Sequence, residues 1–230
     1  MKNRYSAATA ALSACMFLYG CGGGGSDYGS TVTSFALQAG YKARVSAGAT
    51  DNFSVSGTCS GSATITTSAA TPAAFEGVAG YSVTTTQTIN LTNCTPASSA
   101  VTSTGYYDSN YAPIGSSTPG VEYAKFLAAP LAIPTAVKVG DTATLSTLTV
   151  YSDSTKATVT GQRLLSYVIE ADTATTAIAN LISKAYNTSS QLLFTQQSRY
   201  RIAADGTLSV ISIDVQESTT GTTHLLYTKI

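Results

Sequence analysis

The sequence from residue 138 onward is a series of short alternating segments, and this pattern limits the possible folds more than any other feature. Each segment alternates apolar and polar residues, and turn-forming Gly, Asn, Asp, Ser and Thr residues lie between the segments. Alternation with a period of two is the pattern of a half-buried β-strand, and short polar connections favour antiparallel neighbours. The pattern predicts a C-terminal antiparallel meander with strands at 142–152, 162–171, 176–186, 192–202, 207–217 and 223–229.

Simple hairpin pairing sorts four of these strands onto one apolar face. The pairing joins Ala171 with Thr176, Tyr186 with Leu192, and Ile202 with Thr207. Because a slip of one residue would invert a strand, agreement among the strands supports the registers. The apolar face then carries Leu165, Tyr167, Ile169, Ile178, Ile182, Phe194, Tyr200, Ile211, Ile213 and Val215. The polar face carries Ser166, Glu170, Ser183, Gln197, Arg199, Arg201, Ser212, Asp214 and Gln216.

The first twenty residues have the organisation of a signal peptide. Lys2 and Arg4 precede an uncharged, alanine-rich run over 5–20, which as a helix would span about 24 Å, less than the roughly 30 Å hydrocarbon core of a membrane. Such a run is typical of a cleaved signal sequence. The segment LYGC, ending at Cys21, resembles the lipobox of bacterial lipoproteins, in which the cysteine is lipidated and becomes the new N-terminus. The segment LSAC, ending at Cys15, competes with it, but the flexible glycines behind Cys21 favour Cys21.

This resemblance implies a lipid-anchored protein on the periplasmic side of the outer membrane, with 1–20 removed and 21–30 serving as a lipidated tether. Gly22 stands where an aspartate would resemble an inner-membrane retention signal. The partner expected from the resemblance is the membrane, reached through the covalent lipid, because several acyl chains give stable anchoring. The rest of the chain resembles envelope lipoproteins of unknown function in its segment between the two later cysteines and in its VGDTATL…YSD and YRIAADGTL hairpins.

Residues 31–94 predict an N-terminal β region that contains a disulfide. The stretch 34–48 alternates up to a glycine, 52–68 predicts two short strands about a turn at Ser60 and Gly61, and 80–94 predicts a longer strand. Cys59 and Cys94 lie near the ends of these strands, and an exported chain meets an oxidising compartment, so the pair is expected to form a disulfide. A zinc site would need further Cys or His ligands at short spacing.

The expected fold is mainly β, with antiparallel sheets in which the C-terminal meander (138–230) packs with the N-terminal β region. Residues 95–137 are rich in Pro, Gly, Ser and Asn and predict a turn-rich connector, within which 121–127 is either a strand or one helical turn. Whether the two β regions form one domain or two stays open at this point. A composition rich in Thr and Tyr favours strands over helices, so very little helix is expected.

The charge balance excludes some partners. The chain has 12 Lys and Arg against 12 Asp and Glu, and charged residues make up 10% of it. Binding to nucleic acid requires clustered cations, so no nucleic acid is expected as a partner. The same argument opposes a polybasic membrane-binding patch.

No pattern in the sequence predicts a catalytic residue, a cofactor or a metal site. The single histidine, His224, lies on a predicted terminal strand, and no G-x-S-x-G motif is present. The aspartates lie mostly at turns, where turn chemistry explains them, although only spatial separation can decide whether two carboxylates pair for glycoside hydrolysis. Asp108 and Asn110 have the first spacing of a calcium loop, without its glycine and distal glutamate.

The segment GYYDSNY is the one cluster that suggests a ligand. Aromatic rings beside amide and carboxylate groups suit stacking on sugars or on other ring-bearing ligands, although tyrosines also cover β cores. The candidate contacts are Tyr106, Tyr107, Asp108, Asn110 and Tyr111. We therefore expect a non-catalytic binding or carrier module for an apolar or sugar ligand. The alternatives are a structural or assembly partner of an outer-membrane complex, with an envelope protein as partner, and an enzyme.

Overall fold

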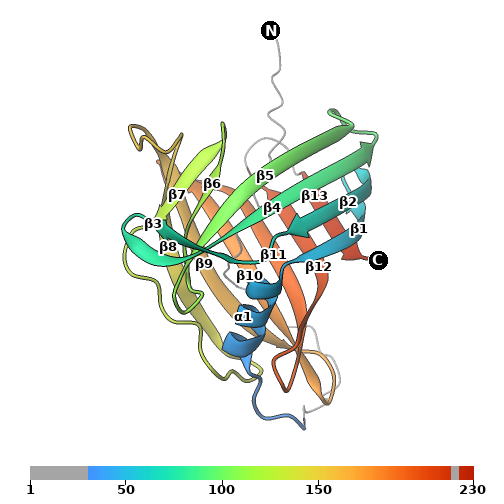
Figure 1. Ribbon diagram of the computed structural model, residues 1–230. Coiled ribbons are helices and arrows are strands. Elements are labelled where there is room, and N and C mark those ends of the chain that lie inside the picture. Colours follow the sequence, from blue (N-terminus) through green and yellow to red (C-terminus); the bar gives the residue numbers. More distant parts are fainter. Residues whose placement is uncertain (1–30, 219–222) are drawn as a thin grey trace.

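The computed structural model describes residues 31–218 and 223–230. In this part of the chain the fold is mainly antiparallel β, as predicted, with one helix at the start (Figure 1). In chain order the elements are α1 (Leu37–Ala47), β1 (Ala49–Gly57), β2 (Ser60–Thr67), β3 (Thr71–Phe75), β4 (Val78–Thr92), β5 (Ser98–Asp108), β6 (Pro113–Thr118), β7 (Glu122–Phe126), β8 (Thr142–Tyr151), β9 (Val159–Ala171), β10 (Thr176–Asn187), β11 (Leu192–Ala203), β12 (Leu208–Glu217) and β13 (His224–Lys229).

Twelve of these strands close into a barrel, and β4 makes the closure. The strands follow the order β2, β1, β13, β12, β11, β10, β9, β8, β7, β6, β5 and β4, and β4 then pairs with β2 again. Strand β4 has 15 residues, and this length lets it pair with two strands along the same edge. Its first part binds β3, from Val78 to Ser82, and its later part binds β2, from Thr85 to Thr92.

The two faces of the barrel wall explain the unusual composition. On β1 the side chains of Phe53 and Val55 are buried inside the barrel, while those of Asn52 and Ser54 between them are exposed. The outward positions of the neighbouring β4 are also mostly hydroxyl-bearing, as at Thr84, Thr86 and Thr88. Serine and threonine therefore provide the polar outer surface that charged residues provide in most proteins.

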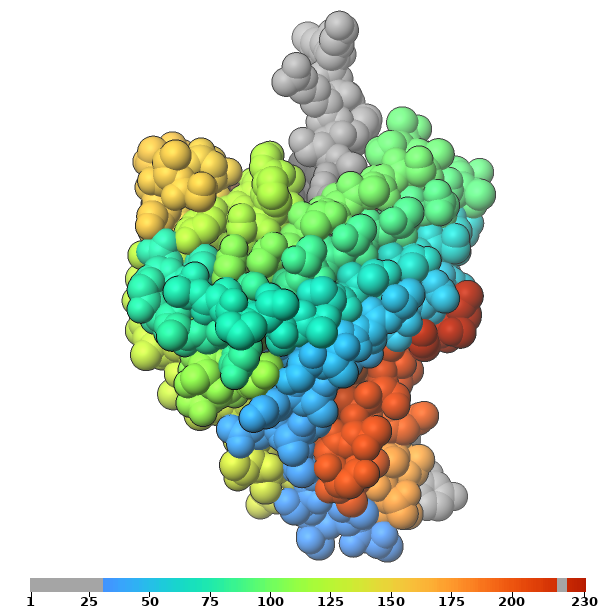
Figure 2. All heavy atoms as spheres, in the orientation of Figure 1, coloured from blue at the N-terminus to red at the C-terminus, as the bar shows by residue number. Residues whose placement is uncertain are grey.

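Helix α1 packs into one end of the barrel. Its buried side chains Leu37, Tyr41 and Val45 recur every four residues, which places them on one helical face. They join a core cluster with residues of β4 and β8 to β11. Gly40 lies against the backbone of Gly206, where a Cβ atom would come within 1.7 Å of the carbonyl oxygen. In Figure 2 the blue helix fills the space between the cyan and green strands and the orange-red β11–β12 hairpin.

The helix corrects the predicted strand at 34–48. Leu37, Tyr41 and Val45 are four residues apart, and this spacing fits both a helical face and every second position of a strand. In so short a segment the two patterns cannot be distinguished. The helical arrangement is favoured because it buries three large side chains against the barrel core. The helix ends at Gly48, whose φ of 69° is a conformation that glycine adopts without strain.

The predicted connector at 95–137 is also corrected, because it contains three strands of the barrel. Strands β5, β6 and β7 lie within it and pair in sequence as a meander. Turn-forming residues occupy short connections between β4, β5, β6 and β7, whereas 127–141 runs to β8 without a strand, as the predicted connector would. The segment at 121–127 is a strand, and all thirteen described strands belong to one sheet.

The predicted strands of the C-terminal meander are confirmed as β8 to β13, with ends that shift by at most three residues. The register between β9 and β10 is wrong by one residue, since Ala171 pairs with Ala177 and not with Thr176. Thr176 instead takes part in the turn, where its hydroxyl donates to Asp172 at 2.6 Å. The slip inverts β10 relative to β9, so Ser183 faces the interior, while Ile178 and Ile182 lie on the opposite face.

Two β-bulges change the remaining registers. Tyr186 pairs with Leu192 as predicted, but the register shifts directly before it. The predicted pair of Ile202 with Thr207 is wrong by one residue, because Ile202 pairs with Leu208. A second bulge in the β11–β12 pair makes Ile211 an extra residue. Ile213 and Val215 are buried inside, as predicted, whereas Ile211 is half-exposed and lies outside both core clusters.

The predicted disulfide is present, and it joins the start of β2 to the end of β4. Cys59 and Cys94 have Cα atoms 5.9 Å apart, and the strands beside them pair directly. The predicted signal peptide at 1–20, the predicted tether at 21–30 and both predicted lipidation sites, Cys15 and Cys21, lie outside the described residues. No helix in the described part of the chain is long and apolar enough to cross a membrane.

Candidate ligand cavity inside the barrel

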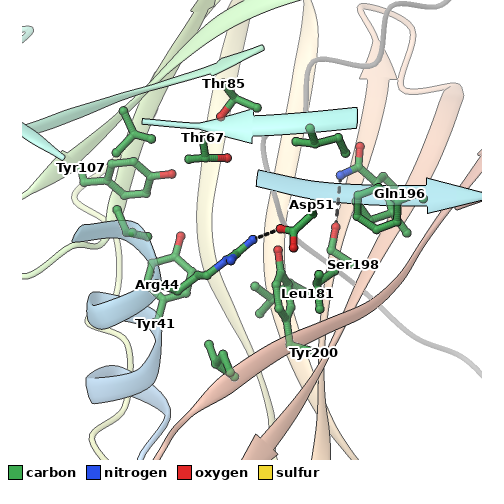
Figure 3. Close-up of a pocket in the computed structure, with 17 residues that line it drawn as sticks. Tyr41, Arg44, Asp51, Thr67, Thr85, Tyr107, Leu181, Gln196, Ser198 and Tyr200 are labelled. Carbon is green, nitrogen blue, oxygen red and sulfur yellow. Dashed lines mark hydrogen bonds and ion pairs between the residues drawn. The ribbon is translucent and has the colours of Figure 1, made fainter. Parts of the chain in front are cut away.

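A cavity of about 100 Å³ lies inside the barrel beside α1. Its walls come from α1 and from strands β1, β2, β4, β5, β10, β11 and β12, so both halves of the sequence contribute (Figure 3). Most of the wall is apolar, and its apolar residues include Phe53, Ile65, Val83, Leu181, Val210 and Ile213. A mainly apolar cavity with a few fixed polar groups is the usual form of a small-molecule site.

One polar side of the cavity is an ion pair between the helix and the sheet. Arg44, in the last turn of α1, binds the Asp51 carboxylate on β1 (Figure 3). Lys229 on β13 binds the other carboxylate oxygen at 3.0 Å. Asp51 is only 8% exposed, so these two cations are the partners of a buried carboxylate. The cation at the C-terminal end of α1 also interacts favourably with the helix dipole, so this pair fixes α1 at the barrel mouth.

The opposite polar side of the cavity is uncharged. Gln196 on β11 donates from Nε2 to Ser198 Oγ at 3.3 Å. Its other amide atom, Oε1, is buried and has no hydrogen-bond partner within the described structure. Across the strand pair, Ser183 on β10 lies directly opposite Gln196, and its hydroxyl is buried without a partner as well.

Aromatic rings complete the wall. Tyr41 of α1 meets Tyr107 of β5 edge to face, with ring centroids 6.4 Å apart. Tyr200 of β11 lies below the ion pair in the view of Figure 3. Phe53 packs edge to face on Tyr227, with centroids 6.3 Å apart, and burial raises the pKa of Tyr227 to about 12. These rings keep the cavity wall rigid.

The structure does not bring the five predicted contacts of the GYYDSNY segment into one site. Tyr107 lines the cavity, but Tyr106 points to the other face and stacks on Phe75 with centroids 4.2 Å apart. Asp108 accepts hydrogen bonds from the backbone amides of Asn110 and Ala112 and so holds the turn after β5.

The remaining predicted contacts belong to this turn. Tyr111 is buried against Tyr81, with stacked rings 4.6 Å apart, and Lys42 lies over its ring. Asn110 is exposed. Alternation on β5 separates Tyr106 from Tyr107, so neighbours in sequence face opposite sides of the wall.

A second charged group, on the outer side of the barrel, fastens the β3–β4 hairpin. Glu76 accepts hydrogen bonds from Lys125 at 2.8 Å, Lys156 at 2.8 Å and the Tyr123 hydroxyl at 2.6 Å. These donors, Lys125 first, lower the pKa of Glu76 to about 2. Burial and the neighbouring carboxylate raise the pKa of Tyr123. This group joins the hairpin tip to β7 and to the β8–β9 turn, and it contributes nothing to the cavity wall.

A third charged group lies inside the barrel, away from the cavity wall. Arg163 on β9 is 2% exposed and binds the Glu122 carboxylate through two hydrogen bonds of 2.8 and 2.6 Å. Such a two-pronged pair holds both strands in one arrangement. His224 on β13 lies 3.1 Å from Asp214. His224 and Asp214 lie on the outer face of β13 and β12, opposite to the buried side chains of Ile213 and Tyr227.

Fold and site together define the class: a closed antiparallel barrel, plugged by a helix at one end, with a small internal cavity. Comparison of the chain with protein-family models, with curated proteins and with solved structures found no match.

Sequence reasoning missed the residues that give the cavity its polar groups. Arg44 and Asp51 are seven residues apart and meet only because a helix ends between them. The spacing of Leu37, Tyr41 and Val45 is the signal that could have revealed this helix. Gln196 carried no signal, because it alternates like any polar strand residue.

Proposed function

We propose that the protein is a lipid-anchored, non-catalytic binding or carrier module of the bacterial cell envelope, and that it holds a small molecule inside the barrel. The observation that carries this proposal is the internal cavity, whose apolar wall is interrupted by a buried amide atom without a partner. Buried polar atoms in folded proteins are nearly always paired, so an unpaired one at a cavity supports a bound partner there.

The anchoring part of the proposal rests on the segment before the barrel. The lipobox-like LYGC segment and the glycines that follow it support lipid attachment at Cys21, with the barrel held on the periplasmic side of the outer membrane. Labelling of cells with radioactive palmitate tests this, with Cys21→Ala as the variant and Cys15→Ala as its control. Label that persists in Cys21→Ala and is lost in Cys15→Ala would move the attachment site to Cys15.

Native mass spectrometry tests the binding function. The protein is purified from its own envelope under non-denaturing conditions, and a bound small molecule is expected as an added mass. Val210→Phe places a larger side chain into the cavity and should remove the added mass. Ile211→Phe is the matched control, since it introduces the same side chain at the next residue, outside the cavity lining. An added mass that neither variant changes, or none in the wild type, contradicts the proposal.

A further inference from the structure

The polar groups on the β10–β11 side of the cavity indicate what its ligand must carry. Gln196 is 1% exposed, lines the cavity and has one end of its amide without a partner among residues 31–218 and 223–230. The oxygen and nitrogen of a glutamine amide can exchange places by a half-turn of the side chain. In one orientation the free end accepts a hydrogen bond, and in the other it donates. A hydroxyl group pairs with either end, because it both donates and accepts.

The neighbouring side chains extend this polar patch. Ser183 is also 1% exposed, faces the interior directly opposite Gln196 and has an unpaired hydroxyl. Ser198, two residues along β11, lines the cavity and already accepts from Gln196. Gln196 and Ser198 therefore place two uncharged polar groups on the β11 side of the cavity, and Ser183 lies beside them on β10, outside the residues that line the cavity.

The charges at the cavity are paired with one another. Each oxygen of Asp51 binds one cation, Arg44 or Lys229, and both cations are also partly exposed to solvent. An ionic ligand would have to compete with these pairs, and a charge beside Gln196 would have no counter-ion. The cavity therefore suits a neutral ligand. Its volume of about 100 Å³ is smaller than the roughly 150 Å³ cavity that holds benzene in another protein, so the ligand can have at most one small ring.

We infer that the ligand, whose presence rests on the proposed binding function, is a small neutral alcohol or phenol. Its single ring or branched chain lies against Phe53, Val83 and Leu181, and its hydroxyl group binds Gln196. Aromatic and aliphatic alcohols share this hydroxyl group, and the probes described next distinguish between the two classes of ligand.

Titration calorimetry of the full-length lipidated protein tests this inference with four probes: phenol, cyclohexanol, benzene and benzoate. Phenol or cyclohexanol should bind about tenfold more tightly than benzene, which is the change expected for one hydrogen bond. The tighter binder of phenol and cyclohexanol shows whether the natural ligand is an aromatic or an aliphatic alcohol. Benzoate should not bind measurably, because its charge has no counter-ion at Gln196.

Gln196→Met keeps the length of the side chain and removes the amide. It should weaken phenol binding about tenfold and leave benzene binding unchanged. Because Gln196→Met also removes the hydrogen bond from Nε2 to Ser198 Oγ, thermal melting must first show that the variant is folded, and its unchanged benzene binding then shows that the cavity is intact. Gln162→Met is the matched control, because Gln162 is exposed on β9.

The outcomes separate this inference from the proposed function. Equal binding of phenol and benzene, tight binding of benzoate, an unchanged phenol affinity in Gln196→Met, or ordered water alone in the cavity would each overturn the hydroxyl ligand. In those cases an added native mass that Val210→Phe removes still supports a binding module. If that mass is absent as well, the binding function itself fails.

Discussion

Truncation of Ile213 tests the register of β12 and the core beneath the cavity. Ile213 is 2% exposed and packs in a cluster with Phe53, Val215 and Tyr227. Replacing a buried isoleucine by alanine lowers the free energy of unfolding by about 2–5 kcal/mol, depending on how far the surroundings close over the space. Because Ile213 already borders a cavity, its neighbours are spread apart and cannot fill the added void. We therefore expect a loss of about 3 kcal/mol for Ile213→Ala.

Ile211→Ala is the matched comparison, because it removes the same atoms two residues away. Ile211 is the extra residue of the bulge and is half-exposed, so its truncation should cost less than about 1 kcal/mol. For a chain of this size, the loss at Ile213 corresponds to a decrease in Tm of about 6–12 °C. Urea denaturation and thermal melting measure both variants. Equal losses, or a larger loss at Ile211, would show that the bulge is misplaced and that simple alternation holds.

Three further predictions concern other parts of the barrel. The pKa of Glu76 is lowered from 4.5 to about 2 in the fold, so its stabilising effect is complete above pH 4.5 and is lost as the pH falls towards 2. Urea denaturation across this range should show that the free energies of unfolding of the wild type and Glu76→Gln converge at the acidic end. A constant difference between the two would contradict the ion pairs of Glu76 with Lys125 and Lys156. Replacing Cys59 and Cys94 by serine should lower the free energy of unfolding by about 3–4 kcal/mol, and the non-reduced wild type should resist thiol alkylation at both positions. Gly40→Ala should displace α1 from the backbone of Gly206 and lower Tm, because no space exists for a Cβ atom; an unchanged Tm would show that α1 packs more loosely.

The strands could be predicted from the sequence where their alternation is regular. Strands β8 to β13 follow the predicted segments closely, because each has a period of two and ends at turn residues. The registers could not be predicted fully. The turn that binds Thr176 and the bulges beside Tyr186 and Tyr200 each shift the pairing by one residue, and local alternation carries no mark of them.

Closure of the barrel and formation of the cavity depend on contacts between distant segments. Pairing of β2 with β4, and of β1 with β13, cannot be derived from hairpin rules, because the partners are not consecutive. The polar groups of the cavity come from α1, β1, β2, β4 and β11, which meet only after this closure. Of the five predicted ligand contacts, Tyr107 alone lines the cavity, because alternation along β5 and the turn at Asp108 direct the others elsewhere.

The position of β13 between β1 and β12 has a consequence for the order of assembly during synthesis. Strand β1 emerges from the ribosome early, yet one of its two neighbours is the last strand of the sheet, and Phe53 pairs with Lys229. Until β13 is made, β1 and β12 both have open hydrogen-bonding edges, and such edges can pair with other chains. The nascent chain is therefore vulnerable to aggregation until its final strand arrives. Insertion of that strand completes the ring and supplies Lys229 to Asp51 in one late step.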